Sequence, residues 1–165
     1  MILKEISECD IDKVYALLQA FPYDDHGFIN EGYGLTKEEI KEYVKERKAW
    51  AVATHLPEGY VPCTTYVAIN DNHEYVGIFN VRHELNAFLE NGPGHIGYGI
   101  HKDYRLKGYG KAGLKIALEI LKTHGVKLAY LSCYKDNAGS LAVQKACGAY
   151  IDHEDEIHYY TRIKL

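Results

Sequence analysis

Long hydrophobic runs are missing from this 165-residue sequence. No apolar stretch approaches the ~20 residues that span a bilayer, and residues 1–12 lack the basic and then apolar pattern of a signal peptide. Positive charge is not in excess either, because 19 Lys and Arg stand against 23 Asp and Glu, which gives a net charge of −4. We therefore expect a cytoplasmic protein that has neither a membrane nor a nucleic acid as its partner.

Closely spaced cysteines are also absent. The four cysteines are far apart and form no CxxC motif: Cys9, Cys63, Cys133 and Cys147. Such spacing indicates neither a zinc site nor a redox dithiol, so we expect reduced packing thiols and no metal. His153 and His158 are five positions apart, which does not place two ligands on one face of a helix. We interpret them as part of a polar turn.

Phenylalanine is scarce as well, with 4 Phe against 15 Tyr. Tyrosine adds a hydroxyl to an apolar ring, and it suits the half-buried wall of a cleft and the half-wet face of a sheet equally. Hydrophobic residues make up 47% and charged residues 25%, which are globular averages. The chain has no internal repeat, and at this length folding buries roughly 70% of the unfolded surface. We expect one domain over residues 1–165.

Clear start signals predict two helices in the first third of the chain. Asp10 is an N-cap for apolar residues that recur at helical spacing, and Thr36 and Glu39 form a capping box. Between these helices, residues 23–35 are rich in glycine and asparagine. They predict a mobile loop of the kind that covers a cleft.

Strand and helix patterns alternate in the rest of the chain. Runs 63–69 and 74–82 predict a hairpin, and the later strands are expected at 95–100, 128–133, 149–152 and 158–164. Helices are expected at 111–123 and 140–147. The fold class is α/β: a mixed β-sheet of about seven strands with helices on both faces. Its central strand–helix–strand unit should have parallel strands and a right-handed crossover.

Glycine and basic residues gather where that unit passes from strand to helix, over residues 104–111. Gly108 to Gly113 formally match the GxGxxG dinucleotide motif, but polar residues 101–107 separate them from the strand and no acidic residue ends the next strand. A P-loop does not fit because Ala112, rather than Ser or Thr, follows Lys111. An ordinary glycine turn leaves unexplained why basic side chains gather at a helix N-terminus, where the macrodipole disfavours cations unless an anion is present.

A pyrophosphate cradle accounts for both the glycines and the basic side chains. Gly108 and Gly110 allow the backbone to approach an anion closely, and the free amides of the first helical turn point outward at it. We therefore predict a pyrophosphate on the amides of Leu106 to Lys111.

This loop carries a resemblance to a known family. Arg105-Leu106-Lys107-Gly108-Tyr109-Gly110 fits the Arg/Gln-x-x-Gly-x-Gly/Ala loop with which the GNAT superfamily of N-acetyltransferases holds coenzyme A. Asn137, Ser140 and Cys147-Gly148-Ala149-Tyr150 are similar to the next helix of these enzymes. Further segments resemble a bacterial subgroup of predicted acetyltransferases: Val76-Gly77, residues 82–86, residues 94–98 and residues 135–137. The resemblance is close over residues 76–165, and over roughly the first 60 residues it rests on the order of elements.

The resemblance implies an acetyl-CoA-dependent N-acetyltransferase that moves acetyl directly to a primary amine of a small molecule or peptide. It implies cofactor contacts from twelve residues: Tyr98, Gly99, Ile100, Arg105, Leu106, Lys107, Gly108, Tyr109, Gly110, Lys111, Asn137 and Ser140. Gly97 and Gly99 weaken an ordinary strand but suit a close backbone approach. A non-catalytic CoA-binding sensor on the same fold, a nucleotide-dependent oxidoreductase and a homodimer remain open.

Proton transfer is where the sequence departs from the superfamily's pattern. Many relatives use a glutamate base and a tyrosine acid, but the matching positions here hold Ser132 and Gln144. His95 begins the cofactor strand and titrates near neutral pH, so we expect it to be the base. Tyr134, at the end of the next strand, is the expected acid, with Tyr98 as the alternative. Proton transfer through solvent stays open, because oriented approach can supply most of the rate.

Arg82 and Asn86 belong to the segments that resemble the bacterial subgroup. We expect both to bind the acceptor. For Arg82, a surface ion pair with Glu84 or another carboxylate is the alternative interpretation.

Overall fold

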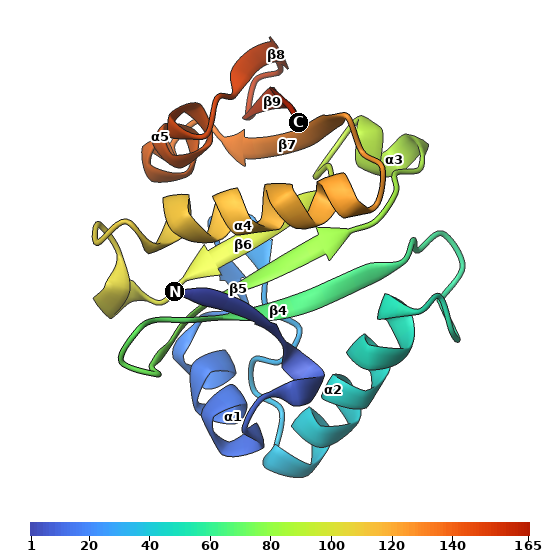
Figure 1. The fold of residues 1–165 in the computed structure, drawn as a ribbon, viewed down its shortest axis with the longest axis vertical. Coiled ribbons are helices and arrows are strands. Elements are labelled where there is room, and N and C mark those ends of the chain that lie inside the picture. Colours follow the sequence, from blue (N-terminus) through green and yellow to red (C-terminus); the bar gives the residue numbers. More distant parts are fainter.

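The computed structural model describes all of residues 1–165 (Figure 1). Nine strands cover Ile2–Glu5 (β1), Asp24–Asp25 (β2), Phe28–Ile29 (β3), Cys63–Ile69 (β4), Tyr75–Arg82 (β5), Ile96–Ile100 (β6), Leu128–Tyr134 (β7), Tyr150–Glu154 (β8) and His158–Lys164 (β9). Five α-helices cover Ile11–Ala20 (α1), Lys37–Ala51 (α2), Ala87–Glu90 (α3), Tyr109–Thr123 (α4) and Ala138–Ala146 (α5). Two 3-10 turns, η1 and η2, cover Ile6–Glu8 and Lys102–Tyr104.

Local signals placed the helix starts correctly. The Asp10 carboxylate accepts the backbone N–H groups of Asp12 and Lys13, and it caps α1. Both hydrogen bonds of the capping box between Thr36 and Glu39 are present at the start of α2. Each cap satisfies amide groups that the first helical turn leaves without a partner.

The central sheet has four antiparallel strands in the order β1-β4-β5-β6. Helices α1 and α2 lie on one face and α4 lies on the other, which confirms the mixed α/β class with helices on both faces (Figure 1). The predicted hairpin of β4 and β5 is also confirmed, with Cys63 opposite Arg82 at its open end. Two hydrophobic clusters fill the two faces, one built around Phe79 and Leu114, the other around Leu18 and Ile40.

A second antiparallel sheet has the order β7-β9-β8, and β2 pairs with β3 in a two-residue hairpin. The nine strands therefore form three sheets, where the sequence predicted one sheet of about seven strands. Residues 23–35, expected to be a mobile loop, contain that hairpin and are anchored by buried Asn30. The Asn30 amide donates to the Leu18 carbonyl at 2.7 Å, and its oxygen accepts the Gly32 N–H.

Strands β6 and β7 explain the division between the sheets. They run in the same direction (Figure 1) but share no hydrogen-bond ladder. They meet at one end, where Gly94 forms an isolated bridge with Leu131 and the His95 N–H donates to the Tyr130 carbonyl at 2.7 Å. Glycine is required at position 94, because its φ is +69° and a Cβ there would lie 2.1 Å from the Tyr130 oxygen.

Side chains from α5 occupy the gap beyond that contact. The Gln144 amide donates to the Ser132 carbonyl in β7 at 3.2 Å. The Tyr98 hydroxyl, from β6, lies 3.1 Å from the Ser140 hydroxyl. Side chains of α5, and not a hydrogen-bond ladder, therefore connect β6 to β7, so the two strands are not joined edge to edge.

Candidate active site

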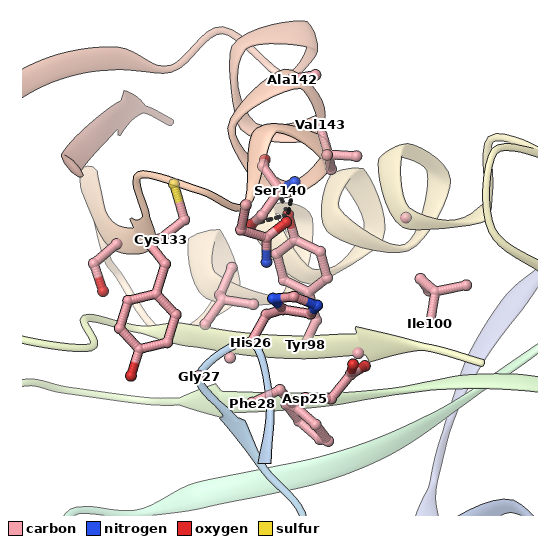
Figure 2. A pocket seen from close by; sticks show the side chains of 18 of the residues that line it. Asp25, His26, Gly27, Phe28, Tyr98, Ile100, Cys133, Ser140, Ala142 and Val143 are labelled. Atoms are coloured by element: carbon pink, nitrogen blue, oxygen red, sulfur yellow. Dashed lines mark hydrogen bonds between the residues drawn. The ribbon is translucent and has the colours of Figure 1, made fainter. Parts of the chain in front are cut away.

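A cavity of about 550 Å³ lies between β6 and β7. The β2–β3 hairpin borders it on one side with Asp25, His26, Gly27 and Phe28, and the first turns of α5 border the other side, with Tyr98 between them (Figure 2). The remaining walls come from the loop before α4, the end of β7 and the start of β9. Ligands of open α/β sheets bind in such a place, beyond the carboxyl ends of diverging strands.

One end of the cavity is formed by the N-terminus of α4. Gly108 is the N-cap residue with φ +86°, and a Cβ there would meet nothing within 4 Å. The backbone N–H groups of residues 106–111 have no acceptor in the protein, because the first helical bond is donated by Ala112 to the Gly108 carbonyl. A row of free amides at the positive end of a helix dipole fits an anion such as a pyrophosphate.

Basic side chains surround these amides with different partners. The Arg105 guanidinium donates to the Ile100 carbonyl at 2.9 Å and forms an ion pair with Asp25. Lys111 lines the cavity, whereas the Lys107 ammonium donates to the Asp103 carbonyl outside the cavity lining. Leu106 follows Arg105 directly; its side chain is exposed and its φ is +61°. Arg105 and Lys111 are thus the cations placed to meet an anion.

The third glycine of the motif serves the core. A Cβ on Gly113 would lie 2.3 Å from the Phe79 ring, so Gly113 allows α4 to pack on β5. Gly110 lies against Val143 of α5, where a Cβ would meet the side chain at 3.3 Å. Tyr109 contributes a free amide, but its side chain packs against the core instead of lining the cavity.

The outer edge of β6 faces the cavity. Strand β6 pairs with β5 through the His95 carbonyl and the His101 N–H, so alternation along the strand turns the backbone groups of Tyr98 and Ile100 to the opposite, unpaired edge. The Ile100 carbonyl accepts the Arg105 Nε–H, and the remaining groups of this edge can pair with an amide-containing chain. Gly99 has another function here, because a Cβ would lie 3.0 Å from the Phe28 ring and 3.1 Å from that of Phe21.

Tyr98 and Gln144 are the polar side chains that connect β6 and β7 to α5. The Tyr98 ring stacks on Phe79 with 5.3 Å between centroids, and burial raises the pKa of its hydroxyl to about 12. A phenol with so high a pKa is a weak proton donor at neutral pH, which disfavours Tyr98 as the acid. The Gln144 oxygen accepts the Thr161 hydroxyl at 2.6 Å. Asn137 caps α5 by accepting the Ser140 N–H at 3.0 Å, and both residues line the cavity.

Comparison with known proteins identifies the family of this chain. Residues 1–150 match the model of the acetyltransferase (GNAT) domain. The chain belongs to the GNAT acetyltransferase family. No curated protein matches the sequence. GNAT acetyltransferases use acetyl-CoA, and the free amides, open Gly108 and basic side chains of the α4 N-terminus fit its pyrophosphate.

Solved structures share this GNAT fold at low sequence identity. A GNAT-family acetyltransferase from Streptococcus pneumoniae superposes with a TM-score of 0.67 at 18% identity, covering 99% of both chains. The Campylobacter jejuni N-acetyltransferase PseH, solved with acetyl coenzyme A, gives 0.61 at 16% identity over 99% of this chain and 97% of its own. The Vibrio cholerae spermidine N-acetyltransferase, solved with CoA and spermine, gives 0.66 at 13% over 99% and 94%.

Tyr134 lies in the cavity of this GNAT protein, at the end of β7. Its ring contacts the backbone of Gly27, where a Cβ would lie 2.7 Å from the ring. It also stacks on the His158 ring, with 4.7 Å between centroids and 26° between planes. The position is compatible with the expected acid, and that assignment stays a prediction.

His95 does not face the cavity, contrary to the expectation for a base. The ring is buried, and its Nδ1 accepts the Tyr130 N–H at 3.0 Å. Desolvation and the charge of Arg82 lower the pKa of His95 to about 4. A base must reach the proton that it removes, but in this structure the His95 ring closes the contact between β6 and β7.

Arg82 and Asn86 are also outside the cavity. The Arg82 side chain is half-buried and donates to the Gly94 carbonyl at 2.9 Å, and it forms no ion pair with Glu84 or another carboxylate. Asn86 caps α3, a helix that the sequence did not predict, by accepting the Leu89 N–H at 3.0 Å. Its amide donates to the Gly59 carbonyl. Both residues thus make structural contacts here, and their binding of the acceptor stays a prediction.

Sequence reasoning missed the residues at the other end of the cavity. His26 and Phe28 come from the hairpin, and His158 and Tyr160 come from β9. The only signal in the sequence was the period-two spacing of His158 and Tyr160, which places them on one face of a strand. Nothing in the sequence shows which strand that face adjoins.

None of the helices has the length and apolar character that a membrane span requires.

Proposed function

We propose that this GNAT acetyltransferase transfers the acetyl group of acetyl-CoA directly to a primary amine of a small molecule or peptide. The observation that carries the proposal is a single cavity lined both by the unpaired amides and basic side chains at the α4 N-terminus and by Tyr134 and His158, with the β2–β3 hairpin along one side. Such a cavity holds two substrates in line, which favours a direct transfer.

In this proposal the pyrophosphate binds the amides of residues 106–111, with Arg105 and Lys111 neutralising its charge. The unpaired edge of β6 at Tyr98 and Ile100 holds the pantetheine arm, beside Asn137 and Ser140. Bound acetyl-CoA supplies an activated thioester. The protein orients the two reactants and excludes bulk water from the end where they meet.

Protons must move during this reaction. A primary amine such as that of lysine has a pKa of about 10.4, so it arrives charged and must lose a proton before it attacks. The thiolate that leaves must gain one. Tyr134 is the proposed proton donor, because its hydroxyl has no hydrogen-bond partner in the protein and its ring lines the cavity.

Calorimetry with CoA, followed by thiol release from acetyl-CoA with a panel of amines, tests the proposal. We expect CoA to bind and at least one amine to raise the rate of thiol release above hydrolysis, with the acetylated amine detected by mass spectrometry. CoA binding without transfer to any amine would support a CoA-binding sensor instead. Absence of CoA binding would contradict the cradle itself.

A further inference from the structure

His158 lines the cavity and belongs to a polar face of the sheet formed by β7 and β9. The register of β7 and β9 places Tyr134 opposite His158 and Ser132 opposite Tyr160, so these four side chains share one face of the sheet. All four line the cavity. Through Tyr134, this face adjoins the tip of the β2–β3 hairpin at Gly27.

Asp155, in the turn between β8 and β9, is held beside His158. Its Oδ1 accepts the backbone N–H groups of His158 and Ile157 at 2.6 and 2.7 Å. Its Oδ2 accepts the Tyr160 hydroxyl at 2.7 Å and lies 3.4 Å from His158 Nδ1. These hydrogen bonds, led by the one from the His158 backbone, hold the pKa of Asp155 well below its usual range. Asp155 is therefore a fixed carboxylate.

A carboxylate beside Nδ1 decides which nitrogen of the ring carries the proton. It favours the neutral tautomer with hydrogen on Nδ1, and this leaves the Nε2 lone pair free. No hydrogen bond occupies Nε2 in the structure. The other groups around the ring are Tyr134 and Tyr160, while Lys135 is paired with Glu154 at 3.1 Å.

We propose that His158 is the general base of the transfer and that Asp155 is its positioning residue. This inference rests on the proposed function. The ammonium of the acceptor first releases one proton to solvent. The amine nitrogen then forms its bond to the acetyl carbon and gives a second proton to His158 Nε2, while the carbon–sulfur bond breaks and the thiolate leaves with the electron pair.

Protons balance in this scheme. The thiolate takes up one proton, from Tyr134 or solvent, and the imidazolium returns the one it accepted. One proton is therefore released per turnover, as the conversion of an ammonium into an amide requires. The assignment also supplies the base that the family pattern lacks here, because Ser132 stands at the glutamate position and His95 faces away from the cavity.

A second histidine in the same hairpin provides a matched control. His153 Nδ1 lies 2.8 Å from Asp152 Oδ2, and its ring stacks on Tyr160 with 4.4 Å between centroids. His153 thus has an aspartate and a tyrosine as neighbours, as His158 does, but it does not line the cavity. If the base must line the cavity, His158 can act as the base and His153 cannot.

The experiment compares His158→Gln, Asp155→Asn, Asp155→Glu and His153→Gln in full-length protein. General-base catalysis contributes about 10²- to 10⁴-fold, so we expect His158→Gln to lower kcat by about 100-fold or more and to remove the acid-side limb of the pH profile. Its affinity for acetyl-CoA, measured by calorimetry, should equal that of the parent. Asp155→Asn should lower kcat less, Asp155→Glu should recover part of that loss, and His153→Gln should match the parent.

Nitrogen NMR of the imidazoles gives a readout that does not depend on turnover. We expect His158 to be the Nδ1–H tautomer in the parent and to lose that preference in Asp155→Asn. The proposal is overturned by a kcat of His158→Gln within threefold of the parent with the acid limb intact, or by an Nε2–H tautomer at His158 in the parent. If the parent binds acetyl-CoA but acetylates no amine, the proposed function fails, and the base assignment is overturned with it even where the tautomer is as expected.

Discussion

Arg105 of the α4 loop forms an ion pair with Asp25 of the β2–β3 hairpin, a residue 80 positions earlier in the chain. Asp25 is the more buried partner, with 12% of its side chain exposed against 43% for Arg105. The pair joins the hairpin to the loop that forms the proposed pyrophosphate cradle. Whatever anion binds there competes with Asp25 for the same guanidinium.

This competition predicts opposite effects for the two partners. Exposed ion pairs contribute about 0.2–1 kcal/mol, so Asp25→Asn should free Arg105 and tighten CoA binding by up to about fivefold. Arg105→Ala should weaken CoA binding by a similar factor, and the effect should shrink as salt is raised, because screening weakens exposed charge contacts. Calorimetry at two salt concentrations measures both. Weaker CoA binding in Asp25→Asn would contradict the competition.

Gly108 predicts a selective loss of CoA binding. A valine at φ +86° is strained, and its side chain would project into the open space at the free amides. We expect Gly108→Val to weaken CoA by about tenfold or more, comparable to losing one charge-assisted hydrogen bond of roughly 1.5–3 kcal/mol. Gly125, with φ +79° and open surroundings at the other end of α4, is the matched control. Gly125→Val should lose stability but keep its CoA affinity. Equal affinities in the two variants would argue against the cradle.

Tyr134→Phe tests the proposed proton donor. The ring and its stacking on His158 are kept, and only the hydroxyl is removed. We expect kcat, measured by steady-state thiol release, to fall by about tenfold or more while CoA affinity, measured by calorimetry, is unchanged. Tyr159→Phe, the next position of β9 on the opposite face, should behave as the parent. Parent-level turnover in Tyr134→Phe would remove the tyrosine from the mechanism.

Gln144 predicts a coupled effect on stability. Gln144→Leu leaves the fully buried Thr161 hydroxyl without its acceptor, and an unsatisfied buried group costs about 1–3 kcal/mol. Replacing both partners, in Gln144→Leu with Thr161→Val, should recover part of that loss, because the unpaired polar group is then gone. Urea unfolding of the two single variants and the double variant measures the coupling. Additive losses would mean that the hydrogen bond does not couple them.

His95 predicts how stability depends on pH. Its pKa is lowered from 6.5 to about 4 in the fold, so between these values the unfolded chain binds a proton that the native protein does not. The free energy of unfolding should therefore fall as pH drops from about 6.5 to 4, and the loss should level off below that range. His83, whose pKa is also lowered to about 4, adds to the same slope. In His95→Gln, urea unfolding at several pH values should show a shallower slope and activity should keep its pH profile. A slope equal to that of the parent would contradict the shift.

The sequence by itself determined the elements whose hydrogen bonds are local. The caps at Asp10 and Thr36 and the hairpin of β4 and β5 depend on residues close together in the chain. The glycine-rich loop before α4 was equally predictable from the sequence, because positive φ at Gly108 and free amides at a helix start are properties of a short segment. Family membership followed from that loop. All of the predicted cofactor residues except Lys107 and Tyr109 line the cavity.

Only the tertiary structure decided what surrounds that loop. His95 looked like a base because it begins the cofactor strand, but its ring is used where β6 and β7 meet, at a contact set by the approach of Gly94 to Tyr130. His158 looked like a turn residue, yet its pairing with Tyr134 brings it into the cavity. Both outcomes depend on register between strands that are distant in sequence, and a shift of one residue would turn each side chain to the other face. The sequence pattern does not specify that register, so the cradle was predictable and the opposite end of the cavity was not.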